Sequence, residues 1–69
     1  MPLSMAPTGV QNIVKRILGK DETRRFLNNL GFVEGSKVCI VSEINGNLII
    51  NVKDTRIAVS KEMANRIMV

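Results

Sequence analysis

The segment RFLNNLGFVEGSKV, residues 25–38, places two glycines four positions apart between a helical pattern and a strand-like run. Gly31 follows the last apolar residue of the helical pattern, where a left-handed residue commonly ends a helix. Gly35 then lies in a tight turn at a position that favours positive φ. The sequence therefore predicts two sharp reversals, which return the chain beneath the helix as a strand.

Residues 21–30 carry the clearest helical pattern in the chain. We expect Asp21 to cap the helix, because its carboxylate accepts free backbone N–H groups and meets the positive end of the helix dipole. The apolar stripe that we expect to be buried contains Thr23, Phe26, Leu27 and Leu30. Phe32, directly after Gly31, is expected to pack back on Leu27 and so to hold the end of the helix.

The residues before this helix indicate extended structure. Two prolines and a glycine in residues 1–10 predict a turn-like lead-in, with Leu3 and Met5 as its anchors in the core. The apolar spacing of residues 10–18 fits a helix or a bulged strand. β-Branched residues dominate the segment and glycines bracket it, so we interpret it as a strand.

Hairpin signals follow the helix. Asn45-Gly46 is typical of a two-residue type I′ turn between strands at 37–44 and 47–53. A further reversal near residue 54 leads into a last strand. Ser60 is expected to cap the closing segment, which the pattern leaves open between a helix and a strand.

Four or five short strands and one inserted helix in 69 residues predict a mainly β fold with a short C-terminal helix or strand. This spacing implies a small, bent antiparallel sheet that closes into a barrel, with the helix at 21–30 covering one end. The length fits one domain, residues 1–69. The apolar fraction of 45% supports a compact core.

The residue types give little support to catalysis or metal binding. The chain has no histidine, and its single cysteine, Cys39, lies within a strand, where a buried and unreactive thiol is expected. Asp21 and Glu22 are explained by the start of the helix. We therefore expect a protein that is not an enzyme and that has no catalytic residues, metal ligands or cofactor. One cysteine and no long apolar run favour a cytoplasmic protein.

Ten basic and six acidic residues give a net charge of +4, which suits an acidic protein partner or a nucleic acid. The basic residues are scattered and both phenylalanines are assigned to packing, so no aromatic platform for bases is expected. A protein-interaction module remains, with its contacts on the outer face of the helix and at the hairpin tip. The predicted contact residues are Lys20, Arg24, Arg25, Asn28, Asn45 and Gly46, while Gly31 and Gly35 are assigned to turns.

Three segments resemble the ferrous iron transport protein A (FeoA) family: LSMAPTG at 3–9, RRFLNNLGFVEGSKV at 24–38, and the whole of residues 47–69. Leu-Gly-Phe-Val-Glu-Gly is the most specific part. The resemblance implies an SH3-like barrel with a helical insertion and a cytoplasmic accessory role in bacterial ferrous iron uptake. It also implies a partner, the cytosolic GTP-binding domain of a membrane iron permease, which handles the Fe²⁺.

One departure from the family concerns the central hairpin. Many members carry a longer Pro/Gly-rich loop there, whereas this chain turns through Asn45-Gly46 alone. Family members are often described as binding transition metals, but we transfer no ligand set to this sequence. Two alternatives stay open: a small basic barrel that binds nucleic acid, and the SH3-like interaction domain of a metal-responsive regulator.

Overall fold

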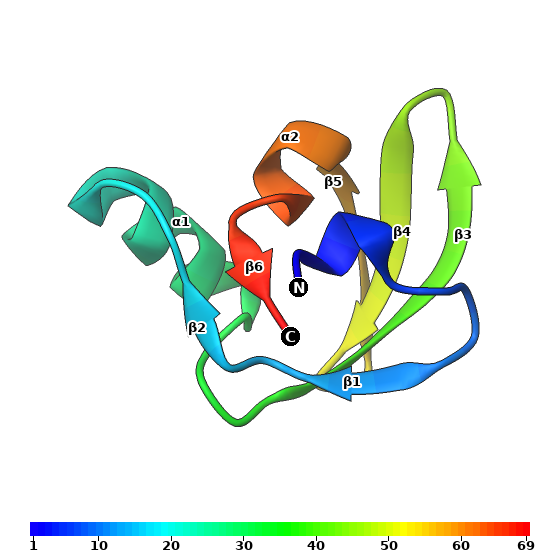
Figure 1. The fold of residues 1–69 in the computed structure, drawn as a ribbon, viewed down its shortest axis with the longest axis horizontal. Coiled ribbons are helices and arrows are strands. Elements are labelled where there is room, and N and C mark those ends of the chain that lie inside the picture. The colour runs from blue at the N-terminus through cyan, green and yellow to red at the C-terminus, as the bar shows by residue number, and fades with distance from the viewer.

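The computed structural model describes residues 1–69, which form the short helices and strands of Figure 1. The helices are η1 (Leu3–Met5, a 3-10 turn), α1 (Asp21–Leu30) and α2 (Lys61–Ala64). The strands are β1 (Gln11–Ile13), β2 (Arg16–Ile17), β3 (Lys37–Ile44), β4 (Asn47–Val52), β5 (Thr55–Ser60) and β6 (Ile67–Met68). Neither α1 nor α2 has the length and apolarity that a membrane-crossing helix requires.

The strands form two antiparallel sheets that do not close into one barrel. The larger sheet has the order β1-β3-β4-β5, and the smaller one pairs β2 with β6. A closed barrel needs a ladder between the outer strands β1 and β5, and no such ladder forms. The prediction of closure is therefore wrong. Figure 1 shows instead that the curved larger sheet surrounds η1 and the C-terminal segment.

The segment predicted as one strand at 10–18 divides at Val14. The N–H of Val14 donates to the Ser36 carbonyl over 2.9 Å, and the Val14 carbonyl accepts from Gly35 N–H over 2.8 Å. The Val14 side chain is buried there. Because the loop holds this residue, the chain changes direction between β1 and β2. This bend sends β2 to β6 and leaves β1 on β3.

The core lies on the inner face of the larger sheet. Side chains of β4 alternate, so that Leu48, Ile50 and Val52 are buried while their neighbours lie toward solvent. Val38 and Ile40 of β3 are paired with Val52 and Ile50, which continues the apolar face across the sheet. The remaining buried side chains are Leu3, Ala6, Val14, Leu27, Phe32, Val59, Ala64, Ile67 and Val69. Met5, the second expected anchor, is instead 72% exposed.

Helix α1 begins and ends at the predicted residues, but its cap differs from the prediction. Lys20 occupies the N-cap position without a side-chain hydrogen bond, and Asp21 is the first helical residue. The C-terminal prediction is confirmed: Gly31 has φ +111°, and Phe32 N–H donates to the Leu27 carbonyl over 3.0 Å. Phe32 is fully buried, so the helix end is held as expected.

The predicted buried stripe of α1 is narrower than expected. Leu27 is buried and Leu30 is half-buried, but Phe26 is 51% exposed. Successive helical side chains are about 100° apart, so a helix that packs through Leu27, with Leu30 beside it, leaves Phe26 at the edge of the contact. The prediction that Phe26 lies in the core is therefore wrong.

The C-terminal segment, residues 61–68, contains both a helix and a strand, the two alternatives that its sequence pattern left open. Ser60 Oγ accepts a hydrogen bond from Met63 N–H over 3.2 Å, which confirms the predicted cap. The helix ends at Ala64, and the chain then becomes β6, whose Ile67 is buried. The N-terminal residues close on this strand, since Val69 N–H donates to the Met1 carbonyl over 2.8 Å.

Gly31→Val is expected to lower the free energy of unfolding by about 1–2 kcal/mol, the cost of a left-handed conformation for a residue with a Cβ. Space is not the cause, because a Cβ at Gly31 would meet Lys53 Cδ and Val52 Cγ2 at an ordinary 3.6 Å. Urea denaturation of the two proteins measures the difference. An unchanged unfolding midpoint would contradict the assignment of positive φ to Gly31.

Candidate protein-interaction surface

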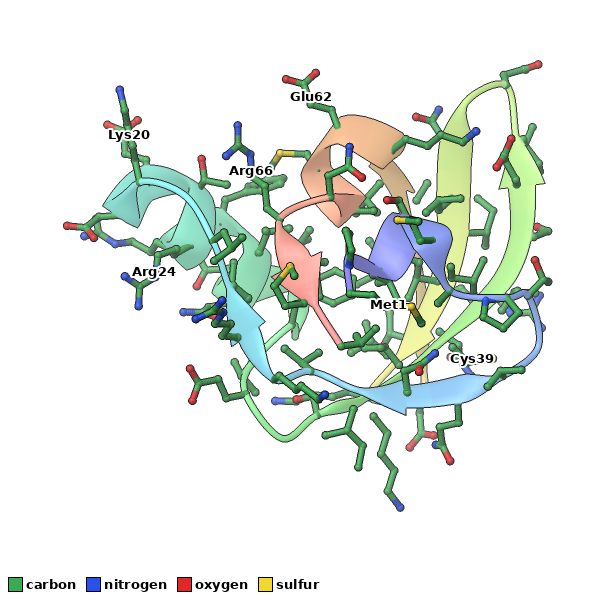
Figure 2. All side chains as sticks on the ribbon, viewed as in Figure 1. Met1, Lys20, Arg24, Cys39, Glu62 and Arg66 are labelled. Carbon is green, nitrogen blue, oxygen red and sulfur yellow. The ribbon has the colours of Figure 1, made fainter.

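Four of the predicted contact residues lie together on α1. Lys20 directly precedes the helix, and Arg24, Arg25 and Asn28 are exposed on it. Arg24 and Asn28 are one turn apart and share a flank, with Arg25 beside them. Figure 2 shows Lys20 and Arg24 extending into solvent from the end of α1 that is remote from the sheet.

None of these cations is engaged by a carboxylate. The ion pair in the structure joins Lys61 Nζ to Glu43 Oε2 over 3.1 Å, and both of these side chains belong to the hairpin side of the molecule. Arg24 and Arg25 also make no side-chain hydrogen bond within the chain. Their guanidinium groups are therefore available to an acidic partner.

A hollow of about 170 Å³ lies beside these residues, between α1, β2 and the loop after Gly31. Its lining residues are Ile17, Arg24, Asn28, Val33 and Glu34. Two aliphatic side chains, Ile17 and Val33, line the hollow together with a guanidinium, an amide and a carboxylate. Such a hollow suits one protruding side chain of a partner protein, because anchoring side chains fill pockets at the centre of interfaces.

Arg66 joins this group from a distant part of the sequence. A Cβ on Gly19 would lie only 3.2 Å from Arg66 Nη1, so the guanidinium lies over Gly19, next to Lys20. The backbone fixes the same approach, since Leu18 N–H donates to the Arg66 carbonyl over 2.7 Å. No local motif around Arg66 predicts this position, because it follows from the pairing of β2 with β6. We define the α1 surface as Lys20, Arg24, Arg25, Asn28, Arg66 and the adjoining hollow.

The other two predicted contact residues lie elsewhere. Asn45 and Gly46 have φ values of 50° and 80°, as a two-residue type I′ turn requires. They form the tip of the β3–β4 hairpin, on the opposite side of the molecule from α1 in Figure 1. Lys61 N–H donates to the Gly46 carbonyl over 3.3 Å and holds the tip to α2. The structure therefore does not bring the two halves of the predicted surface together.

The acidic and thiol groups form no recognisable ligand set. No three His, Cys, Asp or Glu side chains lie close enough together to hold a metal ion. Asp21 and Glu22 are exposed in the first turn of α1. Cys39 is half-buried on the outer face of β3 rather than buried in the core, and Sγ lies 3.7 Å from the Ile40 carbonyl oxygen.

Comparison with protein-family models matches residues 1–69 to the FeoA domain. The chain belongs to the FeoA family. It is 35% identical over 68 residues to an Fe(2+) transport protein A of Methanocaldococcus jannaschii, with 99% of this chain and 83% of that protein covered.

Solved FeoA structures share the fold. One, described as an iron uptake regulatory protein (FeoA), superposes with a TM-score of 0.91 at 32% identity and covers 99% of this chain and 92% of its own. Another, the FeoA of Stenotrophomonas maltophilia solved with zinc and described as a prokaryotic SH3 domain protein, gives 0.85 at 30% identity, with 99% and 87% covered. These matches confirm the mainly β, SH3-like fold and the resemblance found in the sequence.

Proposed function

We propose that this FeoA-family protein is a single-domain, non-enzymatic accessory component of ferrous iron transport in the cytoplasm. Its partner is the cytosolic GTP-binding part of the iron permease, and the contact is made by the α1 surface. The observation that carries this proposal is the set of unpaired cations beside a hollow: Lys20, Arg24 and Arg25 are exposed, and Arg66 is half-buried. Fe²⁺ is cargo of the permease and is not held by this chain.

The composition of the α1 surface supports a protein partner. Arginine is enriched at protein interfaces, because its planar guanidinium forms bidentate bonds with carboxylates and also stacks on aromatic faces. Charges at the edge of an interface mainly raise the association rate, while a side chain buried in a hollow at its centre slows dissociation. We therefore propose an acidic patch on the permease domain, with one protruding apolar side chain that enters the hollow between Ile17 and Val33.

Nucleic-acid binding is a second candidate, because an aromatic ring is exposed on the helix. The sequence predicts that Phe26 packs in the core, yet its ring is 51% exposed. It lies about 160° from Arg24 around α1, at the other margin of the exposed face, so the two side chains do not share one surface. Single-strand binding typically uses several aromatic side chains along a basic groove. The exposed ring therefore favours this candidate only weakly relative to the α1 surface.

An NMR titration tests the proposed function. The ¹⁵N-labelled protein is titrated with the permease's cytosolic domain, with and without GTP, and in parallel with Fe²⁺. We expect chemical-shift changes at residues 17–28 and at Arg66 that require the protein partner, and the GTP series shows whether nucleotide controls the contact. Changes confined to Asn45 and Gly46 would move the contact to the hairpin. Changes with Fe²⁺ alone at Asp21 and Glu22 would contradict the absence of a metal site.

A further inference from the structure

A second hollow, of about 310 Å³, lies on the outer face of the larger sheet and shares no residue with the α1 surface. Its lining residues are Gln11, Ser36, Lys37, Val38, Cys39, Asn51, Lys53 and Asp54. The pairing of the strands explains the position: Cys39 of β3 is opposite Gln11 of β1 on one side and Asn51 of β4 on the other. Val38 borders the hollow, but like Val52 it is buried in the core.

Most of the side chains that line this hollow carry a hydrogen-bond donor. Lys37 and Lys53 carry positive charge, and Gln11, Asn51 and Ser36 each have N–H or O–H groups. None of these side chains takes part in a hydrogen bond or an ion pair within the chain. The one carboxylate among the lining residues is that of Asp54, so the formal charge of the hollow is positive. Donors of this kind bind oxyanions, and the hydrogen bonds that a charged donor makes to an oxyanion are the strongest.

Lys53 occupies a position where turn chemistry alone favours another residue. Lys53 and Asp54 form the β4–β5 turn with φ values of 50° and 61°. Such turns favour Asn-Gly, the pair that this chain uses at Asn45-Gly46. The stem of Lys53 passes close to Gly31, since its Cδ lies 3.6 Å from where a Cβ on that glycine would be. A left-handed lysine at the margin of a donor-rich hollow is consistent with a binding role for that side chain.

We propose that this hollow binds an oxyanion, either a phosphate group or a carboxylate. Lys37 and Lys53 supply the charge, and the amides of Gln11 and Asn51 orient the bound oxygens. The volume is at the lower end of the range for ligand sites, which suits a small anion or a single acidic side chain. Asp54 opposes the anion and keeps the affinity moderate. This site is independent of the proposed permease contact.

NMR titration at constant ionic strength tests the proposal, with inorganic phosphate in one arm, a capped Glu-Glu peptide in another and sodium chloride as the reference. We expect saturable shifts of the side-chain amide signals of Gln11 and Asn51 and of the backbone at residues 36–39. Tighter binding of phosphate identifies a free phosphate-type ligand, whereas tighter binding of the peptide identifies an acidic protein segment. Shifts that rise linearly and match those in chloride overturn the proposal.

Matched variants distinguish binding at this hollow from a general effect of surface charge. Lys37→Gln is expected to weaken phosphate binding roughly tenfold, because one charge-assisted bond is lost. Lys15→Gln, which removes the same charge from an exposed residue outside the hollow, should change it by less than about twofold. Asp54→Asn should strengthen binding by a few fold through the loss of repulsion. Equal effects of the two lysine variants would show that phosphate binding depends on net charge alone, and would overturn the proposal.

Discussion

Phe32→Ala is expected to leave the chain largely unfolded at room temperature. Phe32 is fully buried, and removal of a buried phenylalanine side chain costs about 3–5 kcal/mol through lost burial and the cavity left behind. A single hydrophobic core in a chain of 69 residues rarely supplies more than about 3–5 kcal/mol, so the loss is as large as the whole stability. The hydrogen bond from the backbone N–H of residue 32 to the Leu27 carbonyl does not involve the ring, so the expected loss comes from burial and packing.

Phe26→Ala is the matched control, because it removes the same ring from a side chain that is 51% exposed. We expect the free energy of unfolding to change by no more than about 0.5–1 kcal/mol, as is usual for surface positions. Urea denaturation followed by circular dichroism, together with amide dispersion in NMR spectra, measures both variants. A well-folded Phe32→Ala protein with a loss below about 1 kcal/mol would show that the core does not depend on this residue.

Reversal of two charges on the α1 surface, Arg24→Glu with Arg25→Glu, is expected to weaken binding of the permease's cytosolic domain roughly 10- to 100-fold at low salt. Both guanidinium groups are exposed and unpaired, so the change replaces attraction to an acidic partner with repulsion. Because neither side chain packs in the core, the fold should be retained. Isothermal titration calorimetry at two salt concentrations measures the affinity.

Arg56→Glu, a reversal on β5 outside the α1 surface, is the control for net charge and should change the affinity by less than about threefold. If the control weakens binding as much, per charge, as the double variant does, the binding depends on the net charge of the protein and not on the α1 surface. If the double variant binds as tightly as the unaltered protein, α1 is not the contact. Steep salt dependence toward single-stranded nucleic acid would instead favour the second candidate.

The sequence alone was sufficient for features that depend on a few neighbouring residues. Gly31, Gly35 and Asn45-Gly46 adopt the left-handed conformations expected of them. Ser60 caps α2 as predicted. In each of these cases the backbone bond or the allowed φ is decided within about four residues, so residue type carries the information. The family resemblance rests on the same local signals around residues 30–35.

Tertiary structure decided the features that require two distant segments. The strand expected at residues 10–18 divides because Val14 bonds to the loop at 35–36. The larger sheet stays open because its outer strands, β1 and β5, do not pair. Phe26 is exposed because the helix packs through Leu27. The apolar periodicity of the sequence fits burial of either side chain almost equally well, so it could not decide between them.

The two candidate sites depend on tertiary structure in the same way. The guanidinium of Arg66 lies over Gly19 because β2 pairs with β6. The donor-rich hollow exists only where β1, β3 and β4 align Gln11, Cys39 and Asn51. Strand register places side chains from separate parts of the chain on one face. Local patterns therefore determined the turns, the helix ends and the family, whereas long-range pairing determined which side chains meet.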